Sequence, residues 1–127
     1  MTLAEVKETL QAELLTQESD LSLEVQSACA SDMMSDVLAF TEPECLIITG
    51  LTNQQTLRTV EIADALAVVF VRGKRPDSEV ISSAITKKIP LLATKFCMHD
   101  ACGLLFSRGL CGVTAKVKNT LCKNGKR

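Results

Sequence analysis

Residues 45–71, CLIITGLTNQQTLRTVEIADALAVVFV, decide the fold that this sequence predicts. Two apolar runs, 45–49 and 66–71, have the length and the β-branched content of buried strands. The stretch between them, 53–63, has helical spacing and begins at Asn53, a residue type that favours helix N-caps. The segment therefore predicts a strand, a crossover helix and a second strand parallel to the first.

The same pattern continues toward the C-terminus. A third apolar run, 90–94, follows a helical stretch at 77–88 that begins at Asp77, and a further helix is expected at 98–108, before Gly109. Strand starts recur every 21 to 24 residues, which is the length of one strand and one crossover helix. These residues predict a parallel sheet covered on both faces by helices.

The N-terminal part adds shorter elements. Thr2 and Glu5 form a capping-box pattern for a first helix. A short strand is expected at 12–16 and another at 23–28, followed by a helix at 31–40 that Ser31 or Asp32 would cap. The fold class is thus α/β: one domain with three layers, α/β/α, around a mainly parallel sheet of four to five strands.

Charge and composition limit the partners. The chain of 127 residues predicts one domain at 1–110 and a tail at 111–127 that carries five basic residues and no acidic one. Residues 1–110 hold nine basic and 15 acidic side chains, and the chain has neither Trp nor Tyr, so nucleic-acid binding is not expected. No apolar run is long enough to span a membrane, and we expect a cytoplasmic protein whose six cysteines are buried, reduced thiols.

The predicted binding site lies beyond the carboxyl ends of the parallel strands, where open α/β sheets bind ligands. The turn 49–53, TGLTN, would present backbone N–H groups to an anion, and the segment 72–75, RGKR, would supply positive charge. The alternative is that the glycines simply turn the chain and that the basic side chains are solvated. The candidate ligand-binding residues are Ser31, Asp32, Gly50, Thr52, Asn53, Arg72, Gly73, Lys74, Thr94 and Lys95.

Other chemistries fit the sequence less well. It contains neither the phosphate-binding loop GxxxxGK[ST] nor the dinucleotide fingerprint GxGxxG. Cys97, His99, Cys102 and Cys111 lack the CxxC spacing of a zinc knuckle, so neither a metal nor another cofactor is predicted. We also expect no catalytic residue, because His99 has no nucleophile partner in an obvious position.

Four stretches together resemble the DRTGG domain, a family similar to the N-terminal domain of HPr kinase/phosphorylase. They are SACASDMMSDVLAF, CLIITGLTN, ADALAVVFVRGKRPDSEVI and IPLLATKFCMHDACGLL, and the resemblance extends to about Leu110. The pentapeptide that names the family is absent, and residues 50–53 take its place. The resemblance implies an α/β accessory module for regulation or dimerisation, found fused to phosphotransacetylases, to HPr kinase and to some pyrophosphatases.

Three functions remain open at this point. The first is a non-catalytic regulatory module, homodimeric by family resemblance, that binds an adenine nucleotide or another phosphorylated metabolite at the strand ends. The second is an interaction protein without a small-molecule ligand, acting as an accessory subunit of a partner enzyme. The third, a small phosphotransfer or redox enzyme that uses His99 or the Cys97 and Cys102 pair, ranks last.

Overall fold

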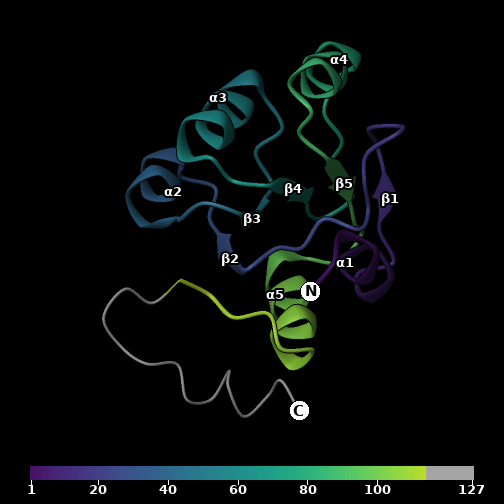
Figure 1. The fold of residues 1–127 in the computed structure, drawn as a ribbon, viewed down its shortest axis with the longest axis vertical. Coiled ribbons are helices and arrows are strands. Elements are labelled where there is room, and N and C mark those ends of the chain that lie inside the picture. The colour runs from purple at the N-terminus through teal and green to yellow at the C-terminus, as the bar shows by residue number, and fades with distance from the viewer. Residues whose placement is uncertain (114–127) are drawn as a thin grey trace.

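The computed structural model describes residues 1–113, in which helices and strands alternate along most of the chain (Figure 1). Within these residues the helices are α1 (Leu3–Thr9), α2 (Met34–Phe40), α3 (Gln54–Ala63), α4 (Ser78–Lys87) and α5 (Met98–Ser107). The strands are β1 (Glu13–Leu14), β2 (Ser27–Ala30), β3 (Cys45–Thr49), β4 (Ala67–Phe70) and β5 (Leu91–Ala93). The predicted tail at 111–127 lies almost entirely outside the described residues and stays a prediction.

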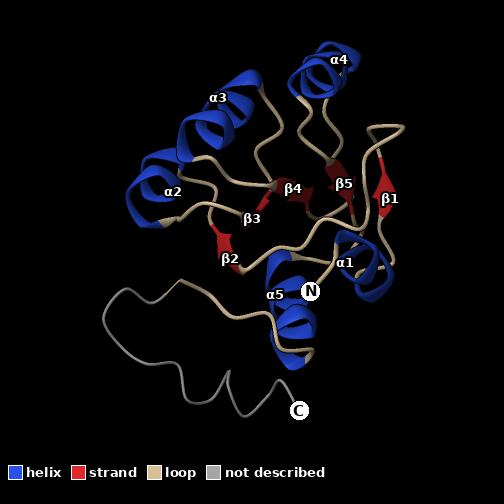
Figure 2. Cartoon of the chain, viewed as in Figure 1, coloured by secondary structure: helices blue, strands red, loops and turns tan. Residues whose placement is uncertain are grey.

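The strands form one five-stranded sheet in the order β1-β5-β4-β3-β2. Strands β2 to β5 are parallel and neighbour one another in chain order, whereas β1 pairs antiparallel with β5. The five-stranded, mostly parallel sheet confirms the predicted α/β class (Figure 2).

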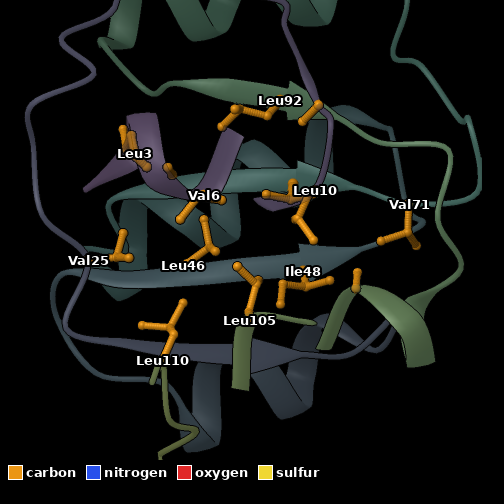
Figure 3. Packing of buried hydrophobic residues seen from close by; sticks show 14 residues of the cluster. Leu3, Val6, Leu10, Val25, Leu46, Ile48, Val71, Leu92, Leu105 and Leu110 are labelled. Carbon is orange, nitrogen blue, oxygen red and sulfur yellow. The ribbon is translucent and has the colours of Figure 1, made fainter. Parts of the chain in front are cut away.

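Helices cover both faces of the sheet and bury two separate apolar clusters. On one face α1 and α5 pack against the sheet through residues such as Leu3, Val6 and Leu105 (Figure 3). On the other face α2, α3 and α4 pack against alternate residues of the same strands, such as Ile47 and Phe70. Because side chains alternate along a strand, the continuous apolar runs of β3 and β4 supply both clusters, and the three-layer prediction is confirmed.

Local chemistry explains where several helices begin. The side chains of Thr2 and Glu5 cap α1 reciprocally, so the predicted capping box is present. Asn53 caps α3 by accepting from the Thr56 N–H, and Asp77 caps α4 by accepting from the Val80 N–H, as predicted.

Two sequence predictions near the N-terminus are wrong. The strand expected at 23–28 begins later, because β2 spans Ser27–Ala30. The residues before it bond instead to the N-terminal segment: the Leu3 N–H donates to the Leu23 carbonyl, and the Val25 N–H donates to the Met1 carbonyl. The helix expected from 31 begins only at Met34, and its N-cap residue, Met33, makes no side-chain cap hydrogen bond. Asp32 does not cap this helix, since its carboxylate bonds to the end of β3.

The chain that follows α5 runs back beside the outer edge of β2. The Ala28 N–H donates to the Cys111 carbonyl at 2.9 Å, and Ala28 and Gly112 form a parallel bridge. Residues on both sides of the predicted domain boundary at 110 thus contact the sheet.

The cysteines differ in environment. Cys45 is buried and Cys29 and Cys102 are partly buried, whereas Cys97 is exposed, and all four thiols are free. The exposed position of Cys97 contradicts the expectation that the thiols are buried.

Candidate functional site

The parallel direction of β2 to β5 brings all of their carboxyl ends to one edge of the sheet. The predicted site residues follow these ends: Ser31 and Asp32 after β2, Gly50 to Asn53 after β3, Arg72 to Lys74 after β4, and Thr94 and Lys95 after β5. The structure divides them into a cluster around Asp32 and a pocket beside Thr94, and it leaves others in purely local contacts.

The Asp32 carboxylate is bound to the end of β3. Its Oδ1 atom accepts from the Gly50 N–H at 2.7 Å and from the Thr49 hydroxyl at 3.1 Å. The Gly50 N–H is the largest of the influences that lower the pKa of Asp32, and the Thr49 hydroxyl and Arg72 also lower this pKa. Asp32 is therefore a stable carboxylate near neutral pH, although its side chain is about half exposed.

Arg72 reaches the same carboxylate from the end of β4. Its Nη2 atom lies 3.4 Å from Asp32 Oδ2, and its side chain is also about half exposed. The Arg72 backbone is fixed in the left-handed region, with φ of 60°, and its N–H donates to the Phe96 carbonyl at 2.8 Å. The guanidinium is thus the part of this residue that can move without disturbing the loop.

Gly50 provides the space for the Arg72 side chain. A Cβ atom built on Gly50 would lie 2.5 Å from Arg72 Nη2, which is closer than real Cβ contacts allow. Gly50 has no positive φ, so its lack of a side chain matters here for space and not for backbone conformation.

A pocket of about 380 Å³ opens beside the ends of β4 and β5. The chain leaves β4 toward α4 on one face of the sheet and leaves β5 toward α5 on the other, and adjacent strands whose connections diverge in this way leave a crevice between them. The lining residues are Leu10, Gln11, Glu13, Gly73, Arg75, Ala93, Thr94, Lys95 and Phe96.

The two arginines of the RGKR segment are both paired with carboxylates. Arg75 donates to the two carboxylate oxygens of Glu13 on β1, at 2.6 and 3.3 Å, and this hydrogen bond is the main cause that lowers the pKa of Glu13. Arg72 is paired with Asp32. Among the salt bridges within residues 1–113, none involves Lys74 or Lys95, so these two exposed lysines carry the unpaired positive charge of this edge.

Several predicted site residues have local structural partners. The Ser31 hydroxyl accepts from the Met33 N–H, and Asn53 is the N-cap of α3. The buried Thr94 hydroxyl donates to the Leu10 carbonyl and accepts from the Phe96 N–H. The hydroxyl of Thr94 is thus already engaged, and Thr94 shapes the pocket mainly by its position.

The predicted anion-binding turn has fewer free amides than expected. The Gly50 N–H donates to Asp32, and the Leu51 N–H donates to the Thr49 hydroxyl at 3.1 Å. Thr52, which follows, is partly buried and lines none of the pockets described for residues 1–113. The binding role of the predicted residues stays a prediction.

Sequence reasoning missed Gln11 and Glu13 as neighbours of the site. They reach it because β1 adds to the sheet beside β5, on the far side from β4. An edge strand of two residues is too short to show a periodic pattern, so the sequence does not predict which strand it pairs with. The only available hint was the position of an isolated acidic residue, Glu13, beside an otherwise apolar segment.

A second, largely apolar pocket of about 650 Å³ lies between α5 and the strands β2 and β3. His99 and Cys102 line it together with apolar residues such as Ile48 and Leu110. Burial raises the pKa of the Cys102 thiol, which keeps it protonated and weakens it as a nucleophile. Within residues 1–113 no group of three or more His, Cys, Asp or Glu side chains is placed to hold a metal ion.

No protein-family model matches this sequence, and no curated protein matches it significantly. A solved structure does. It is the crystal structure of the CBS and DRTGG domains of the regulatory region of Clostridium perfringens pyrophosphatase, complexed with its activator diadenosine tetraphosphate. The match has a TM-score of 0.69 at 18% sequence identity and covers 82% of this chain.

The fold is similar to that of a regulatory region that contains a DRTGG domain. The match covers 45% of the pyrophosphatase chain, so this chain spans less than half of that structure. The likeness supports the family resemblance at the level of the fold, whereas the similarity to HPr kinase stays a prediction. None of the helices within residues 1–113 is long and apolar enough to cross a bilayer.

Proposed function

We propose that this protein is a non-catalytic regulatory module that binds an adenine nucleotide or another phosphorylated metabolite. The binding site would be the pocket beside the ends of β4 and β5. The observation that carries the proposal is the position of this pocket, which lies where the connections from two adjacent parallel strands diverge and which is lined by Arg75 and Lys95. The complex of a similarly folded regulatory region with diadenosine tetraphosphate supports the same class of ligand.

The charges at this edge suit a phosphorylated ligand. Lys95 lines the pocket, and Lys74 follows Gly73, another lining residue, so both ammonium groups are available to phosphate oxygens. Phe96 is partly buried in the lining and offers an aromatic ring to a nucleobase. No Ser, Cys or His lines this pocket, and the Thr94 hydroxyl is already engaged, which favours binding over catalysis by a nucleophile and histidine pair.

The test is isothermal titration calorimetry of the full 127-residue chain with AMP, ATP and diadenosine tetraphosphate. The variant K74Q/K95Q removes both unpaired charges and should weaken binding of at least one of these compounds by tenfold or more. The control K87Q/K88Q removes two exposed lysines at the end of α4. They lie near the start of β5, at the end of the strands opposite to the pocket, and this variant should bind as the wild type does. If no compound binds, or if K74Q/K95Q binds as tightly as the control, the proposed site is wrong.

Exposed apolar side chains support a second candidate, an interaction protein that self-associates or docks on a partner enzyme in the cytoplasm. Phe40 at the end of α2 is 65% exposed and Ile62 on α3 is 73% exposed, and these two helices pack side by side. Large exposed apolar residues at neighbouring sites are typical of protein interfaces. Light scattering of the wild type and of F40S/I62S tests self-association: a dimer that the variant loses supports it, and a monomeric wild type excludes it.

A further inference from the structure

The groups that hold the Asp32 carboxylate are those that would hold a phosphate. A backbone N–H from Gly50, a hydroxyl from Thr49 and a guanidinium from Arg72 all point at one carboxylate. Phosphate oxygens accept hydrogen bonds from the same donors, and arginine binds both kinds of anion. The Asp32 carboxylate therefore satisfies donors at the ends of β3 and β4 that would otherwise be available to a phosphate.

The two oxygens of Asp32 are bound unequally. Oδ1 is held at 2.7 and 3.1 Å by groups at the end of β3, whereas Oδ2 meets Arg72 through one nitrogen at 3.4 Å. By comparison, Arg75 contacts Glu13 through two nitrogens, the shorter contact being 2.6 Å. The Asp32–Arg72 contact is thus the weaker ion pair and the easier one for a ligand to replace.

We infer that Asp32 is a built-in competitor that holds the Arg72 guanidinium until a phosphate or polyphosphate group of the ligand replaces it. This inference rests on the proposed function, and it adds a specific residue that sets the threshold for anion binding. The Arg72 backbone is fixed by its bond to Phe96, so only the side chain has to turn from Asp32 toward the neighbouring pocket. Lys74 and Lys95 lie on the same loops and would share the ligand's charge.

Gly50 makes the contact sterically possible, which gives a second way to break it. An added Cβ would press on Arg72 Nη2 at 2.5 Å but would lie at an ordinary 3.5 Å from Asp32 Oδ1. The flexible guanidinium would therefore move away, while every charge in the site remains. The change G50A separates the contact itself from the negative charge of Asp32.

The experiment measures binding of inorganic pyrophosphate and of ATP to the full chain by calorimetry. Both D32N and G50A should bind more tightly than the wild type, by roughly two- to fivefold, which corresponds to the loss of one exposed ion pair. The control E61Q also converts one carboxylate to an amide and breaks an exposed pair, Glu61 with Lys87 at 3.5 Å, and it should leave binding unchanged. Circular dichroism and thermal melting confirm that each variant is folded.

The outcomes separate this inference from the proposed function. If the wild type binds and K74Q/K95Q does not, but D32N or G50A fails to bind more tightly, the competitor role is overturned while the binding site stands. If D32N binds more tightly and G50A does not, the gain comes from removing the negative charge of Asp32. The proposed role of the Asp32–Arg72 contact is then overturned as well. If neither the wild type nor any variant binds pyrophosphate or ATP, the proposed function and the inference both fail.

Discussion

The hydroxyl of Thr94 donates to the carbonyl of Leu10 at 2.7 Å, joining the end of β5 to the end of α1 across 84 positions of the sequence. The same hydroxyl accepts from the Phe96 N–H at 3.3 Å. Thr94 is buried, and its one hydroxyl oxygen bonds to both groups.

Replacing Thr94 by valine keeps the shape of the side chain and removes its hydroxyl. We expect T94V to lower the free energy of unfolding by about 1–3 kcal/mol, because a buried carbonyl would lose its partner. Urea denaturation measures this loss, and T94S, which keeps the hydroxyl, should remain within about 1.5 kcal/mol of the wild type. Equal stability of T94V and the wild type would contradict a stabilising role for this hydroxyl.

The cap of α4 offers a more local test. Asp77 accepts from the Val80 N–H at 3.0 Å, so D77A should destabilise the fold by about 0.5–2 kcal/mol. Asparagine is an equally good N-cap, and D77N is the matched control. Equal melting temperatures for D77A and D77N would contradict a stabilising role for this cap.

Two neighbouring leucines on α5 differ sharply in burial. Leu105 is 1% exposed and belongs to the core beneath the sheet, whereas Leu104 is 37% exposed. We expect L105A to lower the free energy of unfolding by about 2–5 kcal/mol, because it leaves a cavity in the core. The variant L104A should cost clearly less in the same urea titration, and similar costs would mean that α5 packs differently.

Acid should weaken the fold through Asp32. Its pKa is lowered in the folded protein, chiefly by the Gly50 N–H, so the folded state favours the carboxylate more than the unfolded chain does. This stabilisation is fully present above the unfolded-state pKa of about 3.9 and disappears as the pH falls through the lower folded-state value.

The comparison of the wild type with D32N isolates this contribution. The difference between their free energies of unfolding should be larger at pH 7 than at pH 2.5, where the wild-type carboxylate is protonated to a greater extent. Because Asp32 is half exposed and screened by solvent, the difference should be small, and a low-salt buffer is the best condition. A difference that grows on acidification would contradict the assigned cause.

The sequence predicted the central elements well for a physical reason. In β3, β4 and β5 every residue is buried, and fully buried strands produce continuous apolar runs that can be recognised without knowledge of their neighbours. The caps Asn53 and Asp77 are also local, because donor and acceptor lie three residues apart. Such features depend on a few adjacent residues.

The site was less predictable because its contacts join distant parts of the chain. The position of Asp32, two residues before α2, favours a helix cap, yet its carboxylate bonds to Gly50, 18 residues further on. Arg75 and Glu13 are 62 residues apart, and their pairing depends on which side of the sheet β1 joins. No local pattern distinguishes a lysine that stays unpaired, such as Lys95, from an arginine that finds a carboxylate.

The segment beside β2 has a consequence for how copies of the protein can meet. The outward-facing N–H of Ala28 donates to the Cys111 carbonyl. The strand at the opposite edge of the sheet, β1, has only two residues. The contact at Ala28 and the shortness of β1 therefore reduce the backbone with which the two outer strands could continue the sheet into another molecule, which is how exposed strands usually aggregate. For the part of the chain that the structure describes, this favours association through the helical surfaces, where side chains and not the backbone decide which partner is accepted.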